Sequence, residues 1–240
     1  MNGTTPVQYP NSVDVAIVNA ALSYTKQAMA RCDPSHDMYH VQRVRGNAIN
    51  IAKTLADRNP DMLVVELAAI LHDVLDKKYL PSEMQGSKPD TLQYLRPFFQ
   101  CISSHSDLIA SGRAALISKV IDNVSWSNEQ ELRAMGEWEG WHDECIELHI
   151  VQDADRLDAI GAIGIMRCAA YSSATNRPLV VPDGDPANMR SAITHFYQKL
   201  VLIEESLKTE HGKELGSKRH KFMIEFLNEV SDEVLASKSH

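Results

Sequence analysis

The chain has 240 residues, enough for one substantial hydrophobic core or two small domains. Hydrophobic residues make up 44% and charged residues 23%, which is ordinary for a globular protein, and aromatic residues are only 6%, so the core should be aliphatic. The formal net charge of −8 argues against a broad positive surface for a nucleic-acid polymer or an anionic membrane. A small local basic site for one phosphate group is still compatible with this charge.

The cysteines and the N-terminal residues bear on the cellular compartment. Cys32, Cys101, Cys145 and Cys168 are widely spaced, with no CxxC pair. The opening residues, MNGTTPVQYP, lack the charged and apolar blocks of a signal peptide, and no run approaches 18 apolar residues. We therefore expect reduced, buried thiols in a cytoplasmic protein.

Two helices are predicted before residue 60. Residues 12–31 form the first, which ends before Pro34 because proline disfavours helix at the residue that precedes it. The second is predicted over residues 36–58, with Asp33 or Ser35 as its cap. Its apolar residues fall three or four apart, which is typical of one buried helical stripe: Val41, Val44, Ala48, Ile51 and Leu55.

The next segment, residues 62–74 (MLVVELAAILHDV), is apolar nearly all round and carries Glu66 inside the apolar run. A helix of this kind belongs in the centre of a domain. The adjacent valines would also suit a buried strand, but the length, the Glu-Leu-Ala-Ala composition and a cap at Asp61 favour helix.

A loop is predicted over residues 81–90, and two or three helices follow, through Phe98 and over residues 111–124. Residues 136–141, with two glycines and two tryptophans, predict a turn. A second long apolar segment runs from residue 144 to about residue 171.

Within that apolar segment, Gly161 and Gly164 would let another helix approach closely. Residues 175–186 predict a polar, proline-rich loop. Two amphipathic helices are predicted to end the chain, one with apolar residues from Ile193 to Leu207 and one from Phe222 to Val230.

These segments show no strand alternation and no internal repeat, so we expect an all-α fold. Because no flexible linker precedes the last two helices, they should pack as a pair on the same core. The expected organisation is a tail at residues 1–11 and a single helical domain at residues 12–240, with its central part at about 36–171 and the C-terminal helices at about 188–238.

Two places combine histidine with an apolar helix. His36, His40 and Arg43 lie within two turns of the second predicted helix, where a histidine beside the buried stripe is more often structural than a ligand. His72 and Asp73 end the most apolar helix, where burial of an imidazole and a carboxylate is costly unless they are paired or bind a metal. A hydrogen-bonded His–Asp pair is the structural alternative.

A third place is an acid cluster, Asp153, Asp155 and Asp158, inside an otherwise apolar segment. Neighbouring buried carboxylates repel one another, so a bound cation is one remedy. Neutralisation of one acid by Arg156 is the other. A solvated helix face would not explain the apolar residues on both sides.

Together the three places give the order H…HD…D, with 32 residues from His40 to His72 and 82 from Asp73 to Asp155. This spacing allows three different helices to contribute inward-facing ligands, as in metal sites of helical bundles.

Three stretches resemble the signatures of a known family: HDMYHVQRV at residues 36–44, LAAILHDVLDKKY at 67–79 and IVQDADRLDAIGAIGIMR at 150–167. They are similar to those of the HD-domain superfamily of metal-dependent phosphohydrolases, in one bacterial and fungal branch. The terminal helices also resemble that branch, so the resemblance extends from about residue 13 to residue 232.

The resemblance implies a metal ligand set of His40, His72, Asp73 and Asp155. Asp153 is the rival for the last position, and the Ala-Asp-x-Leu context favours Asp155. We expect one divalent ion, manganese first, with iron, zinc, cobalt, nickel or magnesium as alternatives. The other histidines before the acid cluster do not match the spacing of the family's two-metal members: His105, His142 and His149.

The residues after the doublet suggest further roles. Asp76 could orient or deprotonate the attacking water, and Lys77 and Lys78 could meet a substrate phosphate. A solvated helix end is the alternative. We expect Asp76 and Lys77 to be catalytic and Lys78 to bind substrate. Further predicted substrate contacts are Arg43, for which a surface salt bridge is the alternative, Asn123 and His36.

The expected function is therefore metal-dependent hydrolysis of a phosphate ester or anhydride in a nucleotide, as a nucleotidase or a nucleoside triphosphate pyrophosphohydrolase. The alternatives are a two-iron oxygenase of the same superfamily and a non-catalytic, metal-bearing binding protein. The expected partner is a small phosphorylated molecule rather than a nucleic-acid polymer or a membrane. The apolar helices would also support a homodimer, although a surplus of Leu and Ile equally fits a core.

Overall fold

The structure, a computed structural model, describes residues 9–30, 32–75, 89–182 and 184–237. Within those ranges the chain forms helices, turns and loops without a strand, which confirms the all-α prediction. The α-helices are α1 (Ser12–Ala28), α2 (Met38–Thr54), α3 (Met62–Leu71), α4 (Thr91–Cys101), α5 (Arg113–Asn123), α6 (Trp126–Met135), α7 (Gly140–Glu144), α8 (Ile146–Asp158), α9 (Gly161–Ala174), α10 (Ala192–Gln198) and α11 (Glu210–Ser237). Short 3₁₀ turns are η1 (Ala56–Arg58), η3 (Pro186–Arg190), η4 (Leu200–Leu202) and η5 (Glu204–Ser206).

Helix α3 is the centre of the bundle. It packs against α1, α2, α5 and α8, and its side chains from Leu63 to Leu71 are buried. Its cap is Asp61, as predicted, whose carboxylate accepts a hydrogen bond from the backbone N–H of Val64. The buried acid Glu66 is compensated by Arg45, whose Nε lies 2.6 Å from Glu66 Oε1, and by the hydroxyl of Tyr9.

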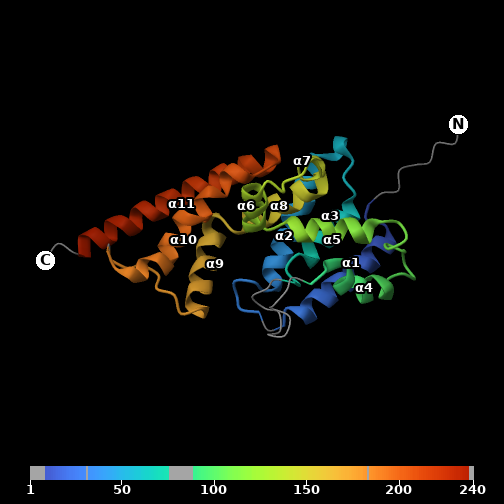
Figure 1. Ribbon diagram of the computed structural model, residues 1–240, viewed down its shortest axis with the longest axis horizontal. Helices are drawn as coiled ribbons and strands as arrows, with labels where there is room; N and C mark the ends of the chain where they lie inside the picture. Colours follow the sequence, from blue (N-terminus) through green and yellow to red (C-terminus); the bar gives the residue numbers. More distant parts are fainter. Residues whose placement is uncertain (1–8, 31, 76–88, 183, 238–240) are drawn as a thin grey trace.

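Helices α2 and α8 lie beside α3 and pack against each other, so three helices from distant parts of the sequence meet in the middle of the molecule. Figure 1 shows α1, α4 and α5 on one side of this centre and α9, α10 and α11 on the other. The C-terminal helix α11 contacts α2, α8 and α9, and the C-terminal segment therefore shares the core.

The predicted apolar segment at 144–171 is two helices rather than one. Helix α8 ends at Asp158, Ile160 is extended, and α9 begins at Gly161 with φ of +75°. A positive φ is costly for residues with a Cβ, so glycine is suited to this break. A Cβ at Gly161 would also lie 2.9 Å from Arg219 Cγ of α11, which confirms close approach there, whereas Gly164 faces the backbone of Ala159.

The first of the two predicted C-terminal helices is also interrupted. Only α10 is α-helical, and the chain continues through η4 and η5 before α11. Leu200, Ile203 and Leu207 nevertheless stay buried. A 3₁₀ turn has three residues per turn, so residues spaced by three remain on one side and the apolar pattern survives the change of helix type.

Two smaller predictions were wrong. Helix α2 begins at Met38 and is capped by Asp37, not by Asp33 or Ser35. The thiols are not all buried, because Cys101 is exposed and Cys32 is half-buried. None of the described helices combines the length and apolar character needed to cross a lipid bilayer.

Candidate metal centre

The first histidine is placed by the start of α2. The carboxylate of Asp37 accepts a hydrogen bond of 2.9 Å from the backbone N–H of His40, which caps the helix. His40 therefore lies in the first turn, and its side chain is only 1% exposed because the turn faces α3 and α8.

The His72–Asp73 pair follows directly on the last residue of α3. Because α3 is buried from Leu63 to its last residue, Leu71, the two side chains emerge inside the protein rather than at its surface. His72 Nδ1 donates to the carbonyl oxygen of Ala69 at 2.9 Å, which fixes the ring and directs Nε2 towards His40.

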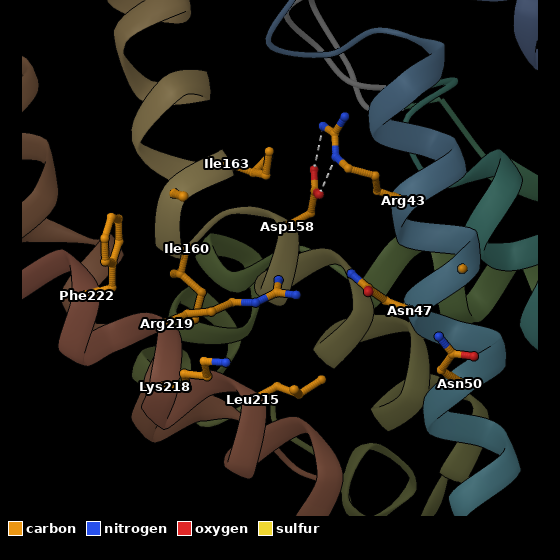
Figure 2. A pocket seen from close by; sticks show the side chains of 13 residues that line it. Arg43, Asn47, Asn50, Asp158, Ile160, Ile163, Leu215, Lys218, Arg219 and Phe222 are labelled. Atoms are coloured by element: carbon orange, nitrogen blue, oxygen red, sulfur yellow. Dashed lines mark hydrogen bonds and ion pairs between the residues drawn. The ribbon is translucent and has the colours of Figure 1, made fainter.

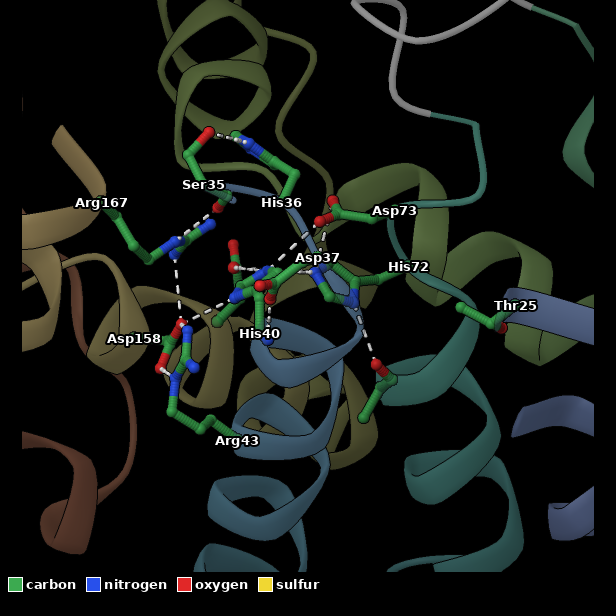
Figure 3. Close-up of polar contacts among 12 residues, drawn as sticks. Thr25, Ser35, His36, Asp37, His40, Arg43, His72, Asp73, Asp158 and Arg167 are labelled. Carbon is green, nitrogen blue, oxygen red and sulfur yellow. Dashed lines mark hydrogen bonds and ion pairs between the residues drawn. The ribbon is translucent and has the colours of Figure 1, made fainter. Parts of the chain in front are cut away.

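The two imidazoles and the two predicted carboxylates converge on one point. The Nε2 atoms of His40 and His72 are 3.2 Å apart. The Asp73 carboxylate oxygens lie 3.2 Å from His40 Nε2 and 3.3 Å from His72 Nε2, and Asp155 Oδ1 lies 3.6 and 3.7 Å from the same two nitrogens. Figure 3 shows His40, His72 and Asp73 turned towards one another. The structure therefore brings together all four residues of the predicted ligand set.

This arrangement suits a bound cation. The Nδ1 atom of His40 donates a hydrogen bond to Asp158, and that of His72 donates one to the carbonyl of Ala69. In the neutral rings both Nε2 atoms therefore carry lone pairs that face each other, and neither Nε2 can donate a hydrogen bond. Asp73 Oδ2 is buried and makes no hydrogen bond of good geometry to the described residues. Lone pairs of two nitrogens and carboxylate oxygens around one point suit a divalent ion with mixed nitrogen and oxygen ligands.

The electrostatics support the same interpretation. Burial lowers the pKa of His40, but the hydrogen bond to Asp158 and the nearby charge of Asp73 outweigh it and raise the pKa to about 9. Burial raises the pKa of Asp73, but the charges of His72 and His40 hold that pKa well below its usual range. Without a metal ion, a proton on His40 balances part of this negative charge, and a metal ion would displace it.

Asp158 forms a second layer behind His40. Its Oδ2 lies 2.7 Å from His40 Nδ1, and Arg43 donates to both of its oxygens, with Nε 2.6 Å from Oδ1 and Nη2 3.0 Å from Oδ2. Arg167 of α9 adds an ion pair, with Nη1 3.3 Å from Asp158 Oδ2. Asp158 is 2% exposed, and although burial raises its pKa, the hydrogen bonds to His40 and Arg43 hold it well below the usual range. Sequence reasoning placed Asp158 in the acid cluster but gave it no role of its own.

The rival acid, Asp153, points elsewhere. Its carboxylate accepts hydrogen bonds from the backbone N–H groups of Lys208 and Thr209, at 2.9 and 2.7 Å, and from the Thr209 hydroxyl at 2.7 Å. It therefore holds the start of α11. Asp155, in contrast, lies beside both imidazoles and is 25% exposed on its outer side.

Arg156, whose neutralisation of one acid was the alternative to a bound cation, forms its ion pair with Glu129 of α6. Its Nη2 lies 2.6 Å from Glu129 Oε2, and Lys208 Nζ lies 2.6 Å from Glu129 Oε1. Burial raises the pKa of Glu129, but the charge of Arg156 and the hydrogen bonds of Lys208 and Arg133 lower it to about 2. This buried network joins α6, α8 and the segment before α11.

The predicted substrate contacts are dispersed. His36 lies next to the cluster, with its ring centroid 6.0 Å from that of His40 and its Nδ1 2.8 Å from Ser35 Oγ. Arg43 forms an ion pair with Asp158, as the salt-bridge alternative anticipated. Asn123 Oδ1 lies 3.2 Å from His142 Nε2, and its Nδ2 donates to the carbonyl of Lys119, so these two contacts lie outside the metal cluster. Asp76, Lys77 and Lys78 fall outside the described residues.

A helical bundle in which three helices direct two imidazoles and two carboxylates at one point defines a class of proteins built around a metal centre. The chain belongs to the HD-domain family, whose pattern matches residues 38–160 and so includes all four clustered residues. It is 31% identical over 199 residues to the YpgQ protein of Bacillus subtilis, an alignment that covers 83% of this chain and 84% of YpgQ.

Solved structures give the same picture. The crystal structure of YpgQ in complex with ADP has a TM-score of 0.66 to this chain at 25% identity, covering 92% of this chain and 96% of that one. An HD-superfamily hydrolase from Bacillus thuringiensis has a TM-score of 0.66 at 26% identity, covering 93% and 99% of the two chains. The resemblance noted from the three sequence stretches is thereby confirmed.

Proposed function

We propose that this protein is a divalent-metal-dependent phosphohydrolase that cleaves a phosphate ester or anhydride of a nucleotide. The observation that carries the proposal is the pair of Nε2 atoms, 3.2 Å apart, whose rings have both used Nδ1 for other hydrogen bonds. Membership of the HD-domain family supports metal-dependent hydrolysis in general. The ADP held by the related YpgQ supports a nucleotide as substrate.

In this proposal His40, His72, Asp73 and Asp155 hold one divalent ion, with manganese as the first expectation. When bound, such an ion acidifies bound water and polarises a phosphoryl oxygen. The protein's own contribution is orientation. Asp158 and the Ala69 carbonyl fix the two imidazoles in the tautomer that presents Nε2, so neither ring has to reorganise.

The side of the cluster open to substrate is that of the two carboxylates. Asp155 is 25% exposed and Asp73 is 14% exposed, whereas His40 is 1% exposed. Water and a phosphate group therefore approach past the acids, on the side where His36 lies. We assign Asp76 and Lys77 to the chemistry and Lys78 and Asn123 to substrate contact, as the family resemblance implies.

The proposal is tested with the purified full chain, freed of metal by chelation and then supplied with Mn²⁺. A panel of nucleoside mono-, di- and triphosphates is incubated with it, and ³¹P NMR distinguishes released phosphate from pyrophosphate. We expect release from at least one nucleotide that depends on added metal and disappears in Asp155→Asn. Absence of both products across the panel, from a folded and metal-loaded chain, would contradict the proposal.

Two other outcomes would redirect it. Two iron ions per chain with oxygen uptake would point to the oxygenase alternative. One tightly bound ion and a bound nucleotide without turnover would point to a metal-bearing binding protein. The metal content and the size of the protein in solution, which also tests for a homodimer, are measured on the same sample.

A further inference from the structure

A groove lies between α2, the α8–α9 turn and α11, with a volume of about 560 Å³. Figure 2 shows Arg43, Asn47 and Asn50 on one wall and Leu215, Lys218 and Arg219 on the other. Ile160, Gly161 and Ile163 of the α8–α9 turn and Phe222 of α11 also line it. A volume of this size is within the range of small-molecule sites, about 300–1,000 Å³.

The groove is separate from the metal cluster. None of the four clustered residues lines it. It follows α2 away from His40, and Asn50 lies ten residues further along that helix, about 15 Å along the axis at 1.5 Å per residue. Asp158 separates the two sites, because its carboxylate faces His40 on one side and belongs to the groove lining on the other.

The groove is positive on an acidic protein. Its lining includes three cations, Arg43, Lys218 and Arg219, against the single carboxylate of Asp158, although the whole chain has a net charge of −8. Arg43 is satisfied by Asp158. Lys218 and Arg219 form no ion pair with any described carboxylate, so two of the three cations keep their charge available for a ligand.

Arg219 is held in place rather than free to swing into solvent. It donates to the carbonyl of Leu157 at the end of α8, and its stem packs over Gly161, where a Cβ would lie 2.9 Å from its Cγ. Burial lowers its pKa, which the charge of Asp158 opposes. A half-buried guanidinium without a carboxylate partner at contact distance is a preorganised donor for an oxyanion.

Apart from the amides of Asn47 and Asn50, the rest of the lining is apolar or glycine. Phe222 is 48% exposed, and with Ile163 and Leu215 it offers a flat surface next to the cationic end. We propose that this groove is a second ligand site, which takes a small phosphate ester with its phosphate at Lys218 and Arg219 and its apolar body against Phe222. The amide of Asn50, across the groove on α2, is a further donor within the lining.

The test uses the full chain with a chelator present, so that the metal centre does not compete for phosphate, and circular dichroism to confirm the fold. Inorganic phosphate and phenyl phosphate are titrated separately, with binding followed by calorimetry and by amide NMR shifts. We expect both to bind and phenyl phosphate to bind more tightly. Phe222→Ala should remove that difference, because the ring supplies the extra contact.

The decisive variant is Lys218→Glu, which places a carboxylate in the groove and should weaken phosphate binding by about tenfold or more. Its matched control is Lys213→Glu, the same charge change on an exposed residue of α11 outside the groove lining. Lys213→Glu and Asp155→Asn should leave the affinity within about twofold.

Three results would overturn the inference: no binding of either probe, equal weakening by both lysine variants, or loss of binding in Asp155→Asn alone. The first removes the site, the second shows only general attraction to charge, and the third moves the phosphate to the metal cluster. Because the protein is free of metal, failure here says nothing against the proposed hydrolysis, and failure of hydrolysis leaves this site standing.

Discussion

Replacement of Asp158 by asparagine tests how much of the metal centre depends on its second layer. The substitution keeps the shape of the side chain but removes the charge that holds Arg43 at 2.6 and 3.0 Å and His40 at 2.7 Å. An amide oxygen still accepts from Arg43, but an amide nitrogen turned to His40 would favour the tautomer with its proton on Nε2. That tautomer has no lone pair on Nε2 for a metal ion in the cluster.

The expected loss of metal affinity is about 10- to 100-fold, which is typical for removal of a carboxylate behind a histidine ligand. The loss corresponds to about 1.4–2.7 kcal/mol of binding free energy. The fold should also weaken, but by less than the roughly 3–5 kcal/mol seen when a fully buried ion pair is broken. The Arg43 side chain is 36% exposed and can regain water when its partner is lost.

The assay is a competitive Mn²⁺ titration against a chromophoric chelator, with urea unfolding of the metal-free protein in parallel. The matched control is Asp61→Asn, which breaks a similar contact, 2.7 Å from Arg113 Nε, while asparagine keeps the cap of α3. Asp61→Asn should leave metal affinity unchanged. If Asp158→Asn binds Mn²⁺ as tightly as the unaltered protein, the role assigned to Asp158 is wrong.

Three further substitutions test contacts that hold the helices around the metal cluster in place. Because the pKa of Glu129 is lowered from 4.5 to about 2, its charge should stabilise the fold by about 3 kcal/mol above pH 4.5, and this contribution is lost as the pH falls towards 2. In urea unfolding from pH 3 to 7, the free energy of unfolding of Glu129→Gln should therefore depend less on pH than that of the unaltered protein. An unchanged pH dependence would refute this prediction. Asp153→Ala should lower the free energy of unfolding, measured in urea, by about 2–4 kcal/mol, because the N–H and hydroxyl of Thr209 lose their acceptor. The affinity for the metal ion should not change. Gly161→Ala should lower the free energy of unfolding by about 1–3 kcal/mol, because Gly161 has a φ of +75° and an added Cβ would contact Arg219. An unchanged stability in thermal unfolding would contradict this expected strain.

Much of the fold was accessible from periodicity. The apolar run before His72 predicted a central helix, and α3 is buried from Leu63 to Leu71. The break between α8 and α9 at Gly161 could not be predicted from periodicity, because the apolar pattern continues across it without interruption. Only the positive φ of Gly161, which the sequence does not show, marks the break. The irregular stretch from Leu200 to Ser206 was missed for a related reason, since 3₁₀ turns preserve the spacing of three on which the helix prediction rested.

The roles of the three acids in α8 were only partly accessible. At about 100° per residue, Asp153 and Asp155 point in nearly opposite directions, so a helical wheel excludes one shared site for both. The helical wheel does not show whether Asp153 or Asp155 points towards α2 and α3. That depends on packing and on Thr209, 56 residues away, which meets Asp153 only in the folded chain. The role of Asp158 likewise depends on His40, 118 residues distant.

The most direct test of the central claim is the metal content of two neighbouring variants, measured by mass spectrometry after equilibration with Mn²⁺. The account predicts one ion per chain in the unaltered protein and in Asp153→Asn, and a large loss in Asp155→Asn, with metal-dependent phosphate release following the ion in each case. Retention of the ion by Asp155→Asn together with its loss from a folded Asp153→Asn would contradict the account.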